Sequence, residues 1–409
     1  MLSTARVAHF PPLYAGGAKC TSLARTFVAD AHGATRDPET GARGQVPTAC
    51  EDARLLPSLG MMLLSCDPGR FQWNTFMGPL ADPTPRGALW VLGDALSSVP
   101  QRVDIVDWPE DCEFHPLGLD VYERAHGEAR VFVVNQRSSY TTIEVLDLVC
   151  DASICHATYV RSIAHPSATH TANSVHAISP HALLVTNTYL IARRAPPRAQ
   201  YVAALATRMP RAWAAALEPI VRLPWLAPML TKLDALLCGG WVAHVTFDER
   251  PTPRENATQY AAGLTVRRIA TGIGFTNGLA VTQDDSALVV ASTVYLGTYV
   301  YPLRVHDAQG RANWTSPDVL GPRVWAPTPF LPDNVALLSR VPGATWSTKD
   351  PLQGASVLVA GHPSVAALER MARFGAPPAP SWVVELAYDE HGQTNEDARC
   401  SRCEFGRRV

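Results

Sequence analysis

The stretch Asn277–Ser292, NGLAVTQDDSALVVAS, decides the fold because it has the pattern of a complete β-hairpin that recurs along the chain. An Asn precedes a short β-branched strand, a polar turn follows, and a second strand returns. Residues 173–187, NSVHAISPHALLVTN, repeat this design, and DNVALLS at 333–339 begins a third copy whose returning strand is expected in SVLVAGH. Repeated four-stranded units of this kind predict a β-propeller. A β-sandwich is the alternative, but it would not place Asn at the same point of successive hairpins.

The rest of the chain extends this all-β interpretation, with a propeller over 46–390, a flexible leader at 1–45 and an unstructured tail at 391–409 that leaves the last blade incomplete. The clearest strands, rich in β-branched and aromatic residues, are expected at 88–94, 118–124, 129–136, 141–149, 240–248, 298–305, 355–362 and 381–389.

Residues 193–238 break the strand pattern with helix-forming runs such as RAWAAALEPIV. The internal prolines shorten any helix in this insert. One interpretation is a helical excursion that packs on one face of the propeller. The other is an interfacial helix that makes peripheral contact with a membrane or lipid.

Composition excludes several classes of protein. The 35 basic and 37 acidic residues give a net charge of −2, unlike the basic surplus of nucleic-acid-binding proteins. Hydrophobic residues make up 47% of the chain and charged residues 18%, which argues against disorder. No apolar run is long enough to predict a transmembrane helix. Nine cysteines fit one or two disulfides, and the lone CxxC at 400–403 lacks partners for a zinc site.

The cellular compartment is predicted from two N-glycosylation sequons. The sequons at Asn256 and Asn313 favour a glycoprotein of the secretory pathway or the extracellular space, although no signal peptide is readable at the N-terminus.

Carboxylate and amide side chains stand just before the predicted strands, where the inner strands of a propeller begin. Such hard oxygen donors suit Ca²⁺ and not zinc. If they converge from different blades, they hold one ion in the central tunnel. The predicted metal ligands are Glu51, Asp52, Asn173, Asn277, Asp333 and Asn334.

At these positions the chain resembles the paraoxonase/arylesterase family of calcium-dependent, six-bladed propeller hydrolases, from about Cys50 to Asp389. The motifs that carry the resemblance are CEDARLLPSLGMMLLS (50–65), FHPLGLDVY (114–122), FVVNQRSSYTTIEV (132–145), NSVHAISPHALLVTN (173–187), GFTNGLAVTQDDSALVVAS (274–292), LPDNVALL (331–338) and LVAGHP (358–363). The resemblance implies six blades. It also implies a catalytic calcium held by Glu51, Asn173, Asn277, Asp333 and Asn334. It assigns Asp52 to a second, structural calcium, which lacks a carboxylate here because Ser174 replaces an Asp.

The histidines depart from the family. In the stretch CEFHPLGLD, at 112–120, the position of the family's catalytic histidine is Leu117, and its supporting histidine aligns with Gln136. His115 is a candidate substitute because it lies two residues earlier, on the same face of an extended chain. His362 matches a family histidine near the tunnel and is the second candidate base. For either histidine, the alternative is a residue hydrogen-bonded in a turn.

The resulting expectation is a calcium-dependent hydrolase of small-molecule carboxylic esters or lactones, of arylesterase or paraoxonase type. The alternative is a calcium-stabilised propeller that has lost catalysis and binds a ligand or partner protein. A propeller similar to strictosidine synthase is a third interpretation, which the calcium ligands argue against.

Overall fold

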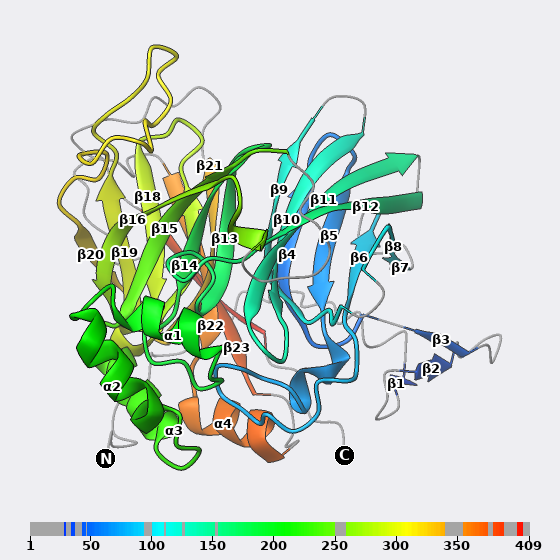
Figure 1. The fold of residues 1–409 in the computed structure, drawn as a ribbon. Coiled ribbons are helices and arrows are strands. Elements are labelled where there is room, and N and C mark those ends of the chain that lie inside the picture. Colours follow the sequence, from blue (N-terminus) through cyan, green and yellow to red (C-terminus); the bar gives the residue numbers. More distant parts are fainter. Residues whose placement is uncertain are drawn as a thin grey trace. The chain divides into compact units, whose positions relative to one another are not determined.

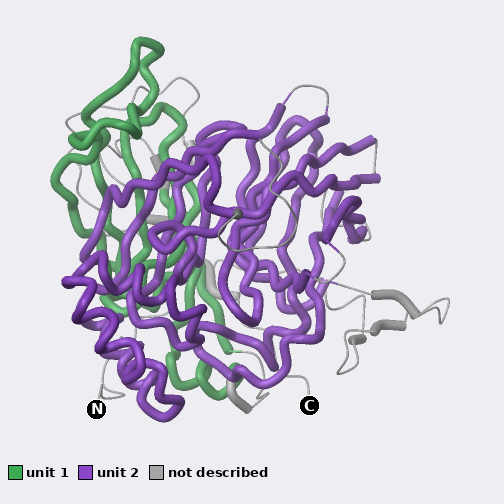
Figure 2. Tube along the Cα trace, viewed as in Figure 1, with its two compact units in different colours: residues 1–21, 273–409 green, residues 22–272 purple. Residues whose placement is uncertain are grey.

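The structure, a computed structural model, describes residues 28–29, 34–36, 43–45, 47–93, 100–109, 112–124, 127–151, 154–249, 259–339, 355–374, 379–387 and 399–403. The chain divides into two compact units, residues 22–272 (unit 2) and residues 1–21 with 273–409 (unit 1), coloured separately in Figure 2. Within the described residues, both units are built from four- or five-stranded sheets of the kind that form propeller blades (Figure 1). The fold is therefore an all-β propeller with a few helices.

Unit 2 contains three of these blades. Blade 1 consists of β4 (Cys50–Leu56), β5 (Met61–Cys66), β6 (Ala88–Leu92) and β7 (Gln101–Arg102). Blade 2 consists of β9 (Pro116–Glu123), β10 (Glu128–Gln136), β11 (Thr141–Asp151) and β12 (Ile154–Ile163), with β8 (Asp104–Val106) added in parallel to β12. Blade 3 consists of β13 (Ala172–Ser179), β14 (Ala182–Asn187), β15 (Gly240–Phe247) and β16 (Leu264–Ile273).

Unit 1 contains the other two blades. Blade 4 consists of β17 (Thr276–Val281), β18 (Ala287–Ser292), β19 (Gly297–Pro302) and β20 (Val324–Pro327). Blade 5 consists of β21 (Leu331–Ser339), β22 (Ala355–His362), β23 (Ser381–Ala387) and β24 (Arg399–Cys403), with helix α4 (Val365–Phe374) between β22 and β23. The predicted strands are thus confirmed, and β22 is the delayed returning strand of the third repeat.

The hairpin of β17 and β18 shows how the opening stretch forms its turn. The hydroxyl oxygen of Thr282 accepts hydrogen bonds from the backbone N–H groups of Ser286 and Ala287, both at 2.8 Å. Asp285 takes a left-handed conformation with a φ of 54°, which Asp tolerates better than most residues. The polar run TQDDS therefore reverses the chain between two strands that are almost entirely buried.

The prediction of six blades is wrong, because the described residues form five sheets of this kind. Where the chain leaves β14, residues 188–239 contain helices instead of strands. The remaining sheet is small, built from β1 (Val28–Ala29), β2 (Ala34–Arg36) and β3 (Arg43–Gln45). These short strands lie in the leader expected at 1–45, most of which lies outside the described residues, so its flexibility stays a prediction.

The tail expected to be unstructured also differs, because β24 pairs in antiparallel fashion with β23. Ser381 opposes Cys403 and Glu385 opposes Arg399 in this pairing. Blade 5 therefore obtains its fourth strand from the segment that contains the CxxC.

The helical insert is confirmed as three short helices: α1 (Arg198–Leu205), α2 (Arg211–Val221) and α3 (Ala227–Leu236). Pro197 and Pro210 precede α1 and α2 directly, where a missing N–H costs no helical hydrogen bond. Tyr201, Leu205 and Val221 are buried in the same hydrophobic cluster as blades 2 and 3. The helices therefore pack on unit 2, as the first interpretation of the insert predicted.

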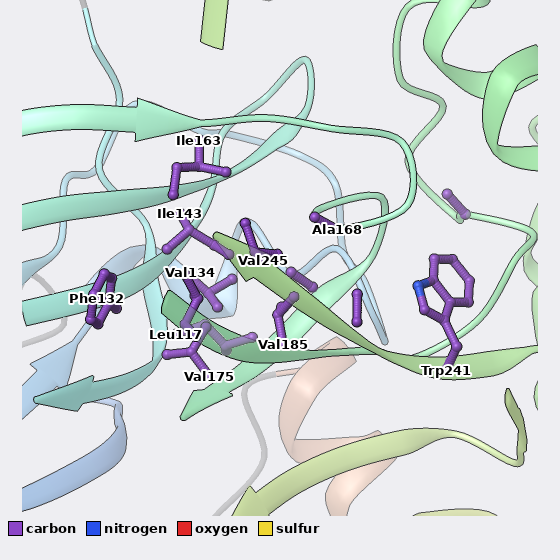
Figure 3. Close-up of a cluster of buried hydrophobic side chains, with 14 of the residues drawn as sticks. Leu117, Phe132, Val134, Ile143, Ile163, Ala168, Val175, Val185, Trp241 and Val245 are labelled. Atoms are coloured by element: carbon purple, nitrogen blue, oxygen red, sulfur yellow. The ribbon is translucent and has the colours of Figure 1, made fainter. Parts of the chain in front are cut away.

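That cluster, shown in Figure 3, also explains why Leu117 carries no chemistry. Leu117 is buried among Val134, Ile143 and Val175. Burying a leucine side chain contributes about 2 kcal/mol to folding. Leu117, the position that the sequence resemblance aligns with a histidine base, is thus used for packing within unit 2.

Two disulfides link neighbouring strands in unit 2. Cys50–Cys66 joins β4 to β5, and Cys150–Cys155 joins β11 to β12. None of the described helices is long and apolar enough to span a bilayer.

Candidate functional site

The first strand of every blade carries a one-residue β-bulge at the same point. In each case the pairing with the second strand shifts by one residue near the start of the first strand. Bulges of this kind re-aim side chains and are common next to active sites. The bulges fall at Glu51, Leu117–Gly118, Asn173–Ser174, Asn277–Gly278 and Asp333–Asn334.

In unit 1 the bulges of β17 and β21 bring Asn277 and Asp333 together. The Asn277 amide nitrogen donates to Asp333 Oδ1 at 2.5 Å and to Thr293 Oγ1 at 3.1 Å. The two bulges are in close contact, because a Cβ added to Gly278 would lie 2.7 Å from the Cα of Asn334. Three of the predicted ligands, Asn277, Asp333 and Asn334, therefore form one cluster.

His362, at the end of β22, belongs to this cluster. Its Nε2 lies 3.4 Å from Asp333 Oδ2, and its Nδ1 lies 3.4 Å from Ser381 Oγ. Burial lowers the pKa of His362, but the hydrogen bond and negative charge of Asp333 outweigh this effect, so the pKa stands above its ordinary value. The side chain is partly exposed.

In unit 2 the bulge of β13 positions Asn173 in the same way. Its amide nitrogen donates to Thr188 Oγ1 at 3.3 Å, as that of Asn277 does to Thr293. A Cβ on Gly118 would lie 2.4 Å from the carbonyl oxygen of Asn173, so the bulges of β9 and β13 also pack against each other.

The amide oxygens of Asn173 and Asn277 are buried and accept no hydrogen bond. Because the threonines hold the amide nitrogens, each oxygen points away from its threonine partner. A buried carbonyl oxygen without a partner is costly, and a bound cation is one way to satisfy it. The donors present therefore fit a hard divalent cation.

A cation here would depend on these amide oxygens. Within the part of the chain that the structure describes, no group of three or more His, Cys, Asp or Glu side chains could hold a metal ion by itself.

The two acidic residues of β4, Glu51 and Asp52, have different environments. Asp52 is buried, and its carboxylate accepts hydrogen bonds from Leu119 N at 3.0 Å and from the Arg54 guanidinium at 3.0 Å. Burial raises the pKa of Asp52, and the charge of Arg54 opposes this rise. Asp52 thus links blades 1 and 2, whereas Glu51 is half-buried at the bulge.

His115 lies at the entry of β9 and is only 1% exposed. Its Nε2 lies 2.9 Å from the carbonyl oxygen of Pro83, and its Nδ1 lies 3.2 Å from Asp67 Oδ2. Its backbone N–H donates to Asn135 Oδ1 at 2.8 Å. Both ring nitrogens thus face acceptors inside unit 2, which favours a structural role.

Sequence reasoning missed the two threonines and the bulges. A signal for the threonines exists: Thr188 and Thr293 each follow directly after the second strand of a repeated hairpin. The bulges have a weaker signal, a small residue after the ligand position, as in Asn173-Ser174 and Asn277-Gly278.

Comparisons with known proteins find no matching protein family and no matching curated sequence. Several solved structures do match. A gluconolactonase from Xanthomonas campestris is 12% identical with a TM-score of 0.40, covering 90% of this chain and 81% of that one. The periplasmic gluconolactonase of Pseudomonas aeruginosa is 14% identical with a TM-score of 0.39, covering 92% and 91%.

Regucalcin from Agrobacterium tumefaciens, described as a calcium-binding protein, is 10% identical with a TM-score of 0.37, covering 86% of this chain and 74% of that one. These similarities are too distant to assign a family, a reaction or a ligand to this chain. No paraoxonase is among these matches, so that resemblance stays a prediction from the sequence.

Proposed function

We propose that the chain is a hydrolase of lactones and related carboxylic esters, assisted by a divalent cation, with Ca²⁺ as the expected ion. The observation that carries the proposal is the buried amide oxygen of Asn277, which accepts no hydrogen bond although its amide nitrogen donates two. This residue adjoins the carboxylate of Asp333 in a cluster of hard oxygen donors.

Unit 1 would supply Asn277, Asp333 and Asn334 as ligands. Glu51 and Asn173, also predicted as ligands from the sequence, belong to unit 2. The buried amide oxygen of Asn173 accepts no hydrogen bond, which supports cation binding by this residue. Asp52 is a weaker candidate, because its carboxylate already accepts hydrogen bonds inside unit 2.

A bound Ca²⁺ would polarise the substrate carbonyl and stabilise the negative charge that develops on its oxygen. We assign His362 as the general base, because it is partly exposed and Asp333 orients its ring. His362 would take a proton from the water that attacks the carbonyl carbon and return it to the departing alkoxide. The lactone ring would open to a hydroxy acid.

The test measures calcium binding and hydrolysis separately on the full chain. Calorimetry after EDTA treatment should show Ca²⁺ binding, and added Ca²⁺ should raise the melting temperature. Hydrolysis of a δ-lactone, followed by acid release, should require the ion. Asp333→Asn should weaken Ca²⁺ binding, whereas Asp318→Asn, the same change at an exposed position of unit 1, should not.

His362→Gln separates catalysis from binding. It should reduce the hydrolysis rate by about 10²- to 10⁴-fold and leave Ca²⁺ affinity close to that of the parent protein. Tight Ca²⁺ binding without hydrolysis of any lactone or ester would instead support the alternative, a calcium-stabilised binding protein. Absence of Ca²⁺ binding would overturn both.

The two disulfides support an oxidising compartment, such as the extracellular space or secretory pathway, because such bonds persist there. Of the two sequons, Asn256 lies outside the described residues. Asn313 lies in a loop between β19 and β20, where its Oδ1 accepts a hydrogen bond from the Thr315 hydroxyl at 2.6 Å. We expect a glycan at Asn313 if the chain enters the secretory pathway.

A further inference from the structure

Helices α2 and α3 of unit 2, with the connection between them that contains Trp225, expose an unusual amount of large apolar surface. Trp213 is 73% exposed and Trp225 is 74% exposed. Single exposed apolar side chains are normal, but a contiguous group of them marks an interaction surface. The other exposed large apolar residues of this segment are Ile220, Leu223, Met229, Leu233, Leu236 and Leu237.

The arrangement on α3 is the reverse of that in an ordinary surface helix. Its fully buried positions are Ala227, Thr231 and Ala235, which are small, and Leu230 is the one large apolar residue of the helix that packs, partly buried, against the core. The large side chains of Met229 and Leu233 lie four residues apart and therefore share the outer face of the helix. A soluble amphipathic helix directs its large apolar residues inward, so packing within unit 2 does not explain this pattern.

Helix α2 shares this orientation. Ala214, Glu218 and Val221 face inward, while Trp213 and Ile220, two turns apart, are exposed. In Figure 1 the two helices follow one another along the chain, in green.

The charges of the insert are complementary to an anionic surface. Residues 193–238 contain seven basic side chains and two acidic ones, a surplus of five positive charges. Both acidic side chains are used internally. Glu218 is buried and forms ion pairs with Arg198 and Arg222, and Asp234 accepts hydrogen bonds from the backbone of Leu190 and Ile191.

The basic side chains of Arg208, Arg211 and Lys232 are exposed in the same segment of the chain. The outer surface of the insert thus combines tryptophan, long aliphatic residues and positive charge. This is the composition of helices that lie in the interface of an anionic membrane.

We propose that α2 and α3 bind the surface of an anionic lipid bilayer, with the helices lying in the plane of the interface. The apolar face, defined as Trp213, Ile220, Trp225, Met229 and Leu233, would enter the boundary between headgroups and acyl chains. The exposed basic residues would lie at the lipid phosphates. The two helices have 11 and 10 residues, about 15 Å each, half of what crossing the hydrocarbon core requires.

The test is co-sedimentation of the full chain with vesicles. The parent protein should bind vesicles of phosphatidylcholine with 30% phosphatidylglycerol, bind pure phosphatidylcholine at least tenfold more weakly, and lose binding to the anionic vesicles in 0.5 M NaCl. The double variant Trp213→Gln/Trp225→Gln should lose at least tenfold in the partition coefficient. Because both side chains are exposed, its melting temperature should stay that of the parent.

The matched control is Leu55→Gln/Ile154→Gln, which changes two exposed apolar residues of unit 2 outside the insert. It should bind vesicles like the parent. Failure of the parent protein to bind anionic vesicles would overturn the proposal, as would equal binding by the tryptophan variant and the parent. Sedimentation velocity identifies the competing occupant: a parent dimer that the tryptophan variant converts to monomers, without vesicle binding, would assign this face to a second copy of the chain.

Discussion

Thr188 and Thr293 fix the orientation of Asn173 and Asn277, as residues that hydrogen-bond to metal ligands do in known metal sites. Each threonine hydroxyl accepts a hydrogen bond from the asparagine amide nitrogen. The hydroxyl of Thr293 also donates to the carbonyl oxygen of Pro332 at 2.7 Å, which fixes its own orientation. Such partners commonly control metal affinity by 10- to 100-fold.

Thr293→Val should therefore reduce Ca²⁺ affinity by about 10- to 100-fold, because the Asn277 amide loses the acceptor that orients it. Thr293→Ser keeps the hydroxyl and should restore most of the affinity. Calorimetric titration of both variants checks this, with circular dichroism to show that they fold. An unchanged affinity in Thr293→Val would remove the threonine from the site.

The contrast between His115 and His362 shows how burial separates two histidines that look equivalent in the sequence. The ring of His115 is enclosed, with an acceptor at each nitrogen. The ring of His362 is partly exposed and lies against a carboxylate of the candidate cluster. General-base chemistry requires contact with water, so the structure favours His362 for this role.

At the scale of elements, the repeated bulge connects fold and site. Four of the five bulges place a predicted ligand position near the start of a first strand, the exception being β9. The bulges of β9 and β13, and those of β17 and β21, pack closely against each other. Gly278 makes this contact possible in unit 1, since a side chain there would meet the backbone of Asp333 and Asn334.

Gly278→Ala should consequently separate β17 from β21. The added Cβ would meet three backbone atoms at 2.7 to 2.8 Å, and overpacking of this kind costs about 1–3 kcal/mol. We expect a lower melting temperature and weaker Ca²⁺ binding.

Gly310→Ala is the control: its Cβ would meet nothing within 4 Å, although φ is +77°. It should cost about 1 kcal/mol without affecting Ca²⁺ affinity. Equal affinities in both variants would contradict the role of this contact.

The strands were predictable because their β-branched residues and turn residues are local signals, and the Asn-containing hairpins such as 277–292 gave the propeller repeat. The number of blades was not predictable in this way: the count of six came from the family resemblance, whereas local strand patterns do not state how many sheets the chain forms. The helices at 193–238 were predictable from their helix-forming runs. Strand β24 was not predicted, because the sequence RCSRC has no strand propensity. It forms a strand by pairing with the edge of β23. The candidate metal ligands were predictable from their residue types and positions before strands. Their partners Thr188 and Thr293 were not, because these contacts depend on how strands meet in space.

At the scale of the whole molecule, stability should depend on pH through buried histidines in unit 2. The Nε2–H of His170 donates to the carbonyl oxygen of Leu190 at 2.8 Å, and the ring stacks on Trp241 with ring centroids 6.2 Å apart. Burial, aided by the charges of Arg268 and Arg194, lowers the pKa of His170 to about 4. Burial and Arg267 lower the pKa of His244 to about 4 as well.

These histidines are neutral in the folded chain and become protonated near pH 6.5 once unfolded. Between pH 6.5 and 4 the unfolded state therefore binds more protons, so the free energy of unfolding falls as the pH is lowered through this window. His170 alone would contribute a loss of at most about 3 kcal/mol. Urea unfolding at pH 7.5 and pH 5, followed by tryptophan fluorescence, measures the difference. His170→Gln should reduce it, because glutamine does not titrate. An identical pH dependence in the parent and in His170→Gln would show that the buried imidazole does not control acid stability.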